Sequence, residues 1–526
     1  MMTKHKTIYG LILTAVLSVS ACQNLETLPE DRYAQETFWR SANAAYGGLV
    51  GCYSTLISRG LYGEDVVLLE EATSPNAYNY NNVDGWSNIA LGTHNASNTN
   101  AIAARWRAAY TMIGRCNALI EGIDGNVELT PDAIVKMKAE ARFLRALSYH
   151  VLTIYFNDVP LITATPDLDQ VTAPRKPRAQ VVDFILGELD AIAAILPPAY
   201  TVATEKGRAT SGAAQALKAR ILLFEASPLF TGTGDAARWR RAADAAKAVM
   251  DLNRYSLFPN YRALFSLANE YNAESIFDIQ FQGPNVGSSF DVTLRQYNTC
   301  APVRELIEAY RMKDGQPRSS STVTDPGNFY SNMDPRFYQT VVYPGATFMG
   351  ATVSNTRFVN TGYTFKKYSV YDAGAASTAE TSLGERQSGI NYMLFRYADV
   401  LLMYAEAKNE LNELTPDVWN ATIRAIRQRA GFTDAAALTY PAGAGKAEFT
   451  DIIRYERRIE FAGEGFYYND IRRWKTAETV LNATIRKYDN TPIIVRKFEP
   501  ARNYLWPVPQ IELERNPNLT QNPGGY

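Results

Sequence analysis

The stretch ELTPDAIVKMKAEARFLRALSYHVLTIYF, residues 128–156, decides the fold class because it describes one long amphipathic helix. Thr130 can accept a hydrogen bond as the N-cap residue, and Pro131 suits the first helical position, where a missing N–H costs nothing. Apolar side chains then recur every three or four residues and form one stripe: Met137, Ala141, Leu144, Leu147, Val151 and Ile154. We therefore expect a mostly α-helical fold.

Similar helices are expected along much of the chain. The stretch ELTPDVWNATIRAIRQRAG, residues 413–431, repeats the same opening with Thr415 and Pro416, and Gly431 suits the position just after the helix. Helical spacing also covers residues 37–58, 99–122, 178–196, 210–226, 236–252, 395–412, 447–462 and 470–486. Neighbouring helices joined by short turns, with Tyr, Ala and Leu at the contacts, indicate tetratricopeptide-like pairs. They are degenerate, because the strict signature of roughly 34 residues is absent.

The middle of the chain differs from the helical parts. Residues 255–392 are rich in Gly, Pro, Ser, Asn and Thr and contain short β-like runs such as SIFDIQF (275–281) and YQTVVYP (338–344). We expect irregular structure with small sheets, packed on the helices. The predicted globular unit, 37–526, thus has an N-terminal helical part (37–254), this irregular part (255–392) and a C-terminal helical part (393–526).

The first residues predict export. A basic start, MMTKHK, precedes an apolar run too short to span a bilayer comfortably, and small residues then lead to Cys22. This resembles a bacterial lipoprotein signal, with residues 1–21 removed, a lipid on Cys22 and residues 22–36 as a flexible tether. The alternatives are a plain secretory signal or a short membrane anchor. No later segment is apolar for long enough to cross a membrane.

Charge and cysteine content exclude some functions and leave others open. The formal net charge of -1 gives no field that would attract nucleic acid. Beyond Cys22, three cysteines remain, and an odd number cannot all pair internally. A Cys52–Cys116 bridge is one interpretation; buried thiols, with Cys300 also unpaired, are the favoured one.

Catalytic and metal signatures are weak. The three histidines match no zinc spacing, and there is no G-x-S-x-G elbow or phosphate loop. Asp124, Asn126 and Glu128 lack the rest of a calcium loop. The acidic residues of 453–474 could serve a glycosidase, but neighbouring arginines would lower their pKa values, so an ion-pair network between helices is favoured: Glu456, Glu460, Glu464 and Asp470. We expect a non-enzyme without cofactor or metal.

Several blocks together resemble the SusD/RagB family of surface glycan-binding lipoproteins of Bacteroidota. They cover essentially the whole mature chain: AEARFLRALSYHVLTIYFNDVPLI (139–162), GRATSGAAQALKARILLF (207–224), ESIFDIQF (274–281), LFRYADVLLMYAEAKNEL (394–411), IRAIRQRAGF (423–432), IRYERRIEFAGEGFYYNDIRRW (453–474) and YLWPVPQIELERNPNLTQNPGGY (504–526). One departure is Asn157, where the family usually has glycine; Asn tolerates a left-handed backbone.

The resemblance implies a SusD-like fold with four tetratricopeptide-like helix pairs and one face covered by irregular structure. It implies a lipid on Cys22, display on the outer surface of the outer membrane, and a SusC-like TonB-dependent transporter as partner, for which the protein is a lid. The shared blocks are scaffold, so the resemblance carries over no ligand residues.

Candidate ligand residues come from the chemistry of sugars, whose C–H faces pack on aromatic rings and whose hydroxyls bind amides and carboxylates. The stretch SPNAYNYNNVDGWSN, 74–88, places such residues in a long loop: Trp86 and Tyr80 as the platform, with Tyr78, Asn81 and Asp84. The alternative is that Trp86 anchors this loop to the core. A second contribution is expected from GSSFDVTLRQYN, 287–298: Phe290, Arg295 and Tyr297.

The leading hypothesis is therefore non-catalytic binding of oligosaccharide or polysaccharide and its delivery to the transporter. A peptide-binding member of the same family is the second hypothesis, and would favour a deep cavity with main-chain hydrogen bonds. A surface glycoside hydrolase and a helical adaptor without a small ligand are the remaining ones.

Overall fold

The structure is a computed structural model that describes residues 38–165, 167–232, 234–377 and 383–526. The predicted signal, the tether and the lipidation residue Cys22 lie outside the described residues. Within the described ranges, no helix is both long and apolar enough to cross a bilayer.

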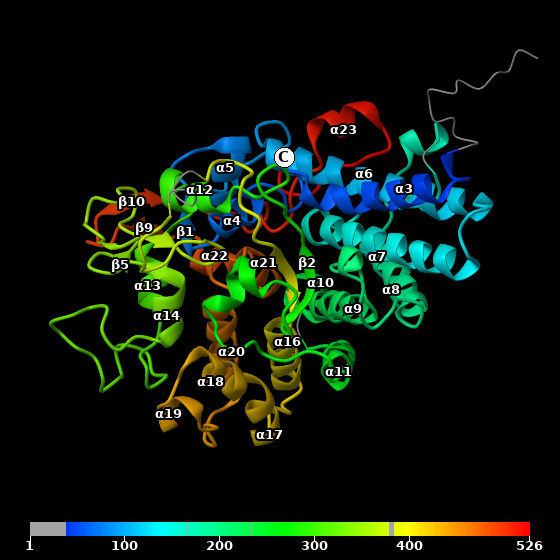
Figure 1. Ribbon diagram of the computed structural model, residues 1–526. Helices are drawn as coiled ribbons and strands as arrows, with labels where there is room; N and C mark the ends of the chain where they lie inside the picture. Colours follow the sequence, from blue (N-terminus) through cyan, green and yellow to red (C-terminus); the bar gives the residue numbers. More distant parts are fainter. Residues whose placement is uncertain (1–37, 166, 233, 378–382) are drawn as a thin grey trace, which may run out of the picture.

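A curved stack of long helices forms one side of the molecule (Figure 1). Each helix of the stack packs on the next helix of the stack, and short helices interrupt the chain between some of them. The stack contains α3 (Ala42–Ser54), α6 (Asn100–Gly122), α7 (Pro131–Phe156), α8 (Arg178–Ala193), α9 (Ser211–Ala226), α11 (Ala236–Asp251), α16 (Tyr397–Glu410) and α20 (Lys446–Glu460). The predicted mostly helical architecture is confirmed.

The capping residues fix where these helices begin and end. The Thr130 hydroxyl accepts a hydrogen bond from the Ala133 amide at 3.3 Å, with Pro131 in the first turn as predicted. Thr415 caps its own helix in the same way. Asn157 follows α7 with φ of 64°, and Gly431 ends α18 with φ of 106°, so both adopt the positive φ expected at a helix end.

Irregular structure covers the opposite side of the molecule, where short helices and two-stranded sheets lie among loops (Figure 1). The short helices are α4 (Val66–Glu71), α5 (Trp86–Ala90), α10 (Pro228–Thr231), α12 (Phe290–Val292), α13 (Arg304–Ala309), α14 (Pro335–Thr340), α17 (Pro416–Trp419), α18 (Ala425–Ala430), α19 (Ala435–Leu438), α21 (Tyr467–Arg473), α22 (Ala477–Val480) and α23 (Gln510–Arg515). A π-helical segment, Asn420–Arg424, joins α17 to α18.

The sheets are small antiparallel pairs: β1 (Ala77–Tyr78) with β3 (Ala301–Pro302), β2 (Ser275–Ile279) with β8 (Tyr392–Arg396), β4 (Val341–Val342) with β7 (Thr364–Phe365), β5 (Thr347–Phe348) with β6 (Ala351–Thr352), and β9 (Thr484–Arg486) with β10 (Pro492–Val495). Two of these pairs join segments more than 100 residues apart. The β1–β3 pair ties the irregular part to the N-terminal helical part, and the β2–β8 pair ties it to the start of the C-terminal helical part.

Two of the expected helices have different boundaries. The first begins at Ala42 rather than near residue 37. The expected helix over 470–486 is wrong: α21 ends at Arg473, Lys475 adopts φ of 54°, and strand β9 begins at Thr484. A left-handed residue cannot continue a right-handed helix, and β9 obtains its hydrogen bonds from β10.

Candidate functional site

The β1–β3 pair brings the two predicted ligand stretches together. Ala77 pairs with Pro302 and Tyr78 with Ala301, so the loop after β1 lies beside the segment that leads into β3. This proximity could not be predicted from either stretch alone, because the paired residues are more than 200 positions apart in the sequence.

Two tyrosine rings are exposed where these stretches meet. The side chain of Tyr80 is 52% exposed and that of Tyr297 is 37% exposed. The Tyr297 hydroxyl donates to Glu385 Oε1 at 3.0 Å, and this hydrogen bond, with a smaller contribution from nearby Tyr80, raises the pKa of Tyr297. Both rings thus lie exposed on the two segments that the β1–β3 pair brings together.

Polar groups surround the two rings. Asp84 accepts from Arg59 Nε at 2.5 Å and from Asn100 Nδ2 at 2.9 Å. Burial alone would raise the pKa of Asp84, but the hydrogen bond from Arg59 helps to lower it below its ordinary value. The carboxylate is therefore charged. The exposed Asn81 forms no side-chain hydrogen bond within the described residues, which leaves its amide able to donate and accept.

Trp86 is not part of an exposed platform, and this prediction is corrected. Its side chain is 3% exposed. The indole packs edge-on against Trp506 with ring centroids 6.1 Å apart, and the Arg105 guanidinium lies 5.6 Å from its ring. Trp86 begins α5 and anchors the loop to the core, as the alternative interpretation stated.

Phe290 is also wrong as a ligand residue, because its side chain is 0% exposed and packs against Phe281 and Tyr368. Arg295 is half-buried and donates to the Tyr371 hydroxyl at 3.1 Å and to the Leu383 carbonyl at 3.2 Å. Tyr78 is half-buried in β1, so only one part of its ring faces solvent. These two residues support the loops around the exposed rings.

Sequence reasoning missed two residues of this site. Glu385 orients the Tyr297 hydroxyl, and Arg59 pairs with both Asp84 and Glu64. No local motif marks either residue. Glu385 follows Gly384 in a segment of turn residues, which is the one local indication that it lies on a surface loop.

The acidic residues of 453–474 are buried in an ion-pair network, which confirms the favoured interpretation. Arg336 binds Glu456 at 2.8 Å, and Arg396 binds Glu460 and Glu464 at 2.8 Å. Despite opposing burial, these and other arginines lower the pKa values of Glu456 and Glu460. Such carboxylates stay ionised at neutral pH and cannot act as the general acid of a glycosidase.

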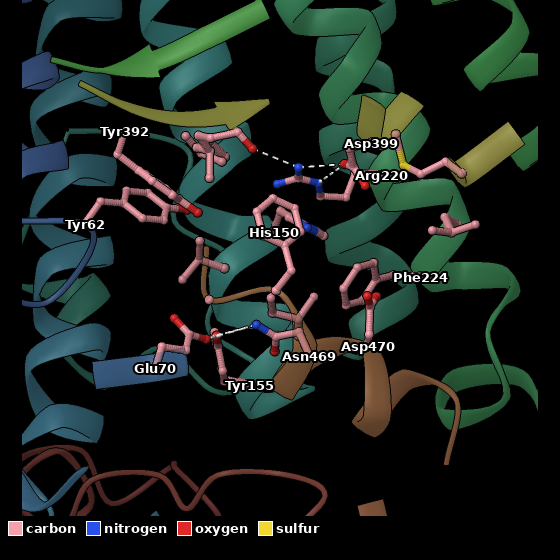
Figure 2. Close-up of a pocket in the computed structure, with 18 of the residues that line it drawn as sticks. Tyr62, Glu70, His150, Tyr155, Arg220, Phe224, Tyr392, Asp399, Asn469 and Asp470 are labelled. Atoms are coloured by element: carbon pink, nitrogen blue, oxygen red, sulfur yellow. Dashed lines mark hydrogen bonds and ion pairs between the residues drawn. The ribbon is translucent and has the colours of Figure 1, made fainter. Parts of the chain in front are cut away.

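A small cavity of about 80 Å³ lies between α7, α9 and α21 (Figure 2). His150 points into it, Arg220 binds Asp399 at 2.7 Å, and Asn469 donates to the Tyr155 hydroxyl at 2.8 Å. Burial lowers the pKa of His150 to about 3, so its imidazole is neutral. The cavity has room for a few water molecules and is too small for a saccharide.

The described residues contain no group of side chains with the composition of a metal site. Asp124 pairs with Lys138, and Glu128 accepts from the Ala42 amide at 2.7 Å, so neither carboxylate is arranged around an ion. Cys52, Cys116 and Cys300 are buried free thiols, as the favoured interpretation expected.

A stack of paired helices that presents exposed rings and amides on loops defines a binding protein with a helical-repeat scaffold. Comparison with known families agrees. Residues 263–526 match the model described as "SusD family", and residues 54–223 match one described as "Starch-binding associating with outer membrane". The chain belongs to the SusD/RagB family.

Relatives cover the whole length. SusD-like protein P2 of Formosa agariphila is 27% identical over 100% of both chains. Among solved structures, a SusD-like carbohydrate-binding protein from Bacteroides fragilis is 28% identical, with a TM-score of 0.78 over 92% of this chain and 100% of that one. A laminarin-binding SusD-like protein, 23% identical, has the same fold, with a TM-score of 0.68 over 93% and 100% of the two chains.

Proposed function

We propose that the protein captures oligosaccharide or polysaccharide at the cell surface without cleaving it. The observation that carries this proposal is the pair of exposed rings, Tyr80 and Tyr297, on segments that the β1–β3 pair brings together. Asn81 follows Tyr80 in the sequence, and Glu385 accepts a hydrogen bond from Tyr297. Each ring offers a flat apolar face to the C–H face of a sugar, and the amide and carboxylate bind its hydroxyls. The carbohydrate-binding relative from Bacteroides fragilis supports a saccharide ligand.

Delivery follows capture in this proposal. The protein hands its saccharide to a SusC-like TonB-dependent transporter and acts as the lid over its mouth. A lipid on Cys22 holds it to the outer membrane, with which one matched family model associates its members. Release requires modest affinity, with a Kd of about micromolar to millimolar.

The test compares variants of the protein that begins at residue 23, which contains every described residue. Calorimetric titration against a panel of neutral oligosaccharides identifies a ligand. Tyr80→Ala and Tyr297→Ala should each weaken binding about three- to tenfold, since a stacked ring contributes about 0.5–1.5 kcal/mol. Trp86→Phe serves as the matched control, because the indole is buried.

Three results would contradict the proposal. Unchanged affinity in the Tyr80→Ala, Tyr297→Ala double variant would place the saccharide elsewhere. Shortening of the oligosaccharide during incubation would show an enzyme, and binding of peptides but no saccharide would favour the peptide-binding alternative.

A further inference from the structure

An open groove of about 640 Å³ lies between α20 and the loop that follows α13. Arginine and aromatic side chains dominate its walls: Arg311, Arg318, Arg454, Arg458, Phe329, Tyr455 and Tyr467. All four arginines are half-buried, so their guanidinium groups are held in place and still reach the groove. We call this feature the arginine groove.

None of these four arginines forms an ion pair within the described part of the chain. Arg454 forms no hydrogen bond there either, and its guanidinium lies 5.0 Å from the Trp474 ring. The other three donate to uncharged oxygens: Arg311 to the Gly315 carbonyl at 3.2 Å, Arg318 to the Phe329 carbonyl at 2.7 Å, and Arg458 to Asn76 Oδ1 at 2.8 Å and the Glu305 carbonyl at 3.2 Å. Their positive charge is therefore compensated only in part.

Arg457 and Arg458 are adjacent in the sequence but differ in their partners. Arg457 points to the interior, where it binds Asp399 and Asp470, each at 2.9 Å. Arg458 faces the groove and has no carboxylate partner. Two neighbouring arginines of α20 therefore differ in their partners: Arg457 is paired with carboxylates, whereas Arg458 is not.

Carboxylates near the groove offset its charge only in part: Asp451 and Glu456 of α20 act on Arg311, and Glu456 is itself bound by Arg336 and Arg427. Glu308 is the one acidic residue among its lining, and it already accepts from Arg304 at 2.9 Å and from Arg486 at 2.6 Å. The Asp334 carboxylate, which accepts from the Tyr455 hydroxyl, is buried and bound to Arg336. The groove therefore attracts anions.

The aromatic walls hold the guanidinium groups and do not form a stacking platform. Arg318 lies 4.2 Å from the Phe329 ring, Arg311 lies 4.5 Å from the Tyr455 ring, and Arg458 lies 4.9 Å from the Tyr467 ring. In addition, the buried Nε of Arg318 has no hydrogen-bond partner in the described residues. Ring faces covered by cations leave the N–H groups as the recognition elements.

We propose that the arginine groove binds the carboxylate or sulfate groups of an acidic saccharide. Guanidinium groups match both anions in charge and in two-pronged hydrogen-bond geometry, and several of them along one groove suit a chain with repeated charges. This inference rests on the proposed function and names its substrate class: polysaccharides that carry uronate or sulfate-ester groups.

The test titrates the protein that begins at residue 23 with hexasaccharides of galacturonate, of sulfated galactose and of neutral galactose, and with hexaglutamate. The acidic saccharides should bind at least about tenfold more tightly than the neutral one, and their affinity should fall between about 50 and about 300 mM NaCl. Arg318→Gln and Arg454→Gln should each cost about tenfold. Arg454→Lys, which keeps the charge, should lose less.

Arg107→Gln is the matched control, because Arg107 on α6 is exposed and unpaired within the described residues but lies outside the groove. Equal binding of acidic and neutral saccharides would overturn the groove assignment, as would unchanged binding in both groove variants. Tighter, arginine-dependent binding of hexaglutamate would instead assign the groove to acidic peptides. Failure of every saccharide to bind would refute the proposed function itself.

Discussion

The substitution Glu460→Gln tests how the core of this protein is held together. Glu460 is fully buried at the end of α20, and its carboxylate accepts hydrogen bonds from three arginines. Arg396 donates at 2.8 Å and Arg336 at 3.3 Å, and Arg429 is the third donor. Glutamine keeps the shape of the side chain and removes its charge.

The size of the effect follows from the pKa. Burial opposes ionisation, but Arg429, Arg396 and Arg336 together lower the pKa of Glu460 from 4.5 to about 2. A difference of about 2.5 pKa units corresponds to about 3 kcal/mol of the free energy of unfolding at neutral pH. Because the folded-state pKa is lowered, this stabilisation is complete above about pH 5 and is lost as the pH falls towards 2.

Urea unfolding followed by tryptophan fluorescence measures the prediction. Glu460→Gln should be about 3 kcal/mol less stable than the unsubstituted protein at pH 7, and the difference should shrink to about half at pH 3. Glu413→Gln is the control: Arg240 and Lys408 lower the pKa of Glu413 to about 2 as well, but at the surface. Little change is expected there. A Glu460→Gln protein as stable as the control would refute the reasoning.

Three further predictions concern buried groups. Burial lowers the pKa values of His94 and His150 to about 3, so each histidine should reduce the free energy of unfolding by about 2 kcal/mol as the pH falls from 6.5 to 5. The His150→Gln variant should lose about 2 kcal/mol less between these two pH values than the unsubstituted protein, as measured by urea unfolding at each pH. Burial raises the pKa values of Cys116 and Cys300, so a thiol reagent should label no cysteine of the native protein that begins at residue 23. After unfolding it should label three cysteines, whereas labelling of a single cysteine would show a Cys52–Cys116 bridge. Asn157→Ala should lower stability by about 1–2 kcal/mol in the same unfolding assay, and Asn157→Gly should change it little, because φ is 64°; equal losses would contradict this.

The helices could be predicted because their signals are local. Thr130, Pro131 and the stripe after them specify α7 without reference to the rest of the chain. The helix over 470–486 was predicted wrongly because the last residues of this segment pair with a strand that lies outside it. Strand β9 pairs with β10, and the sequence of either strand alone does not indicate the other.

The functional site was predicted only in part, because it too depends on contacts outside the local sequence. Composition identified the loop 74–88, but the exposure of each ring within it depends on residues elsewhere. Trp86 is buried because Trp506 and Arg105 pack against it, while Tyr80 remains exposed to solvent. Loop composition predicts ligand chemistry, whereas tertiary packing decides which ring is available for it.

The choice of substrate also depends on tertiary packing, because packing decides which charged side chains are paired. A formal net charge of -1 gives no overall field that would attract nucleic acid. The carboxylates are not evenly placed, however: Glu456, Glu460 and Glu464 are buried with arginine and lysine partners and contribute little field outside. Unpaired arginines of the groove then act at short range, where screening by salt is weakest. A chain that is nearly neutral overall can therefore bind an acidic ligand selectively. Its choice of ligand depends on which arginines lack carboxylate partners, and not on the net charge.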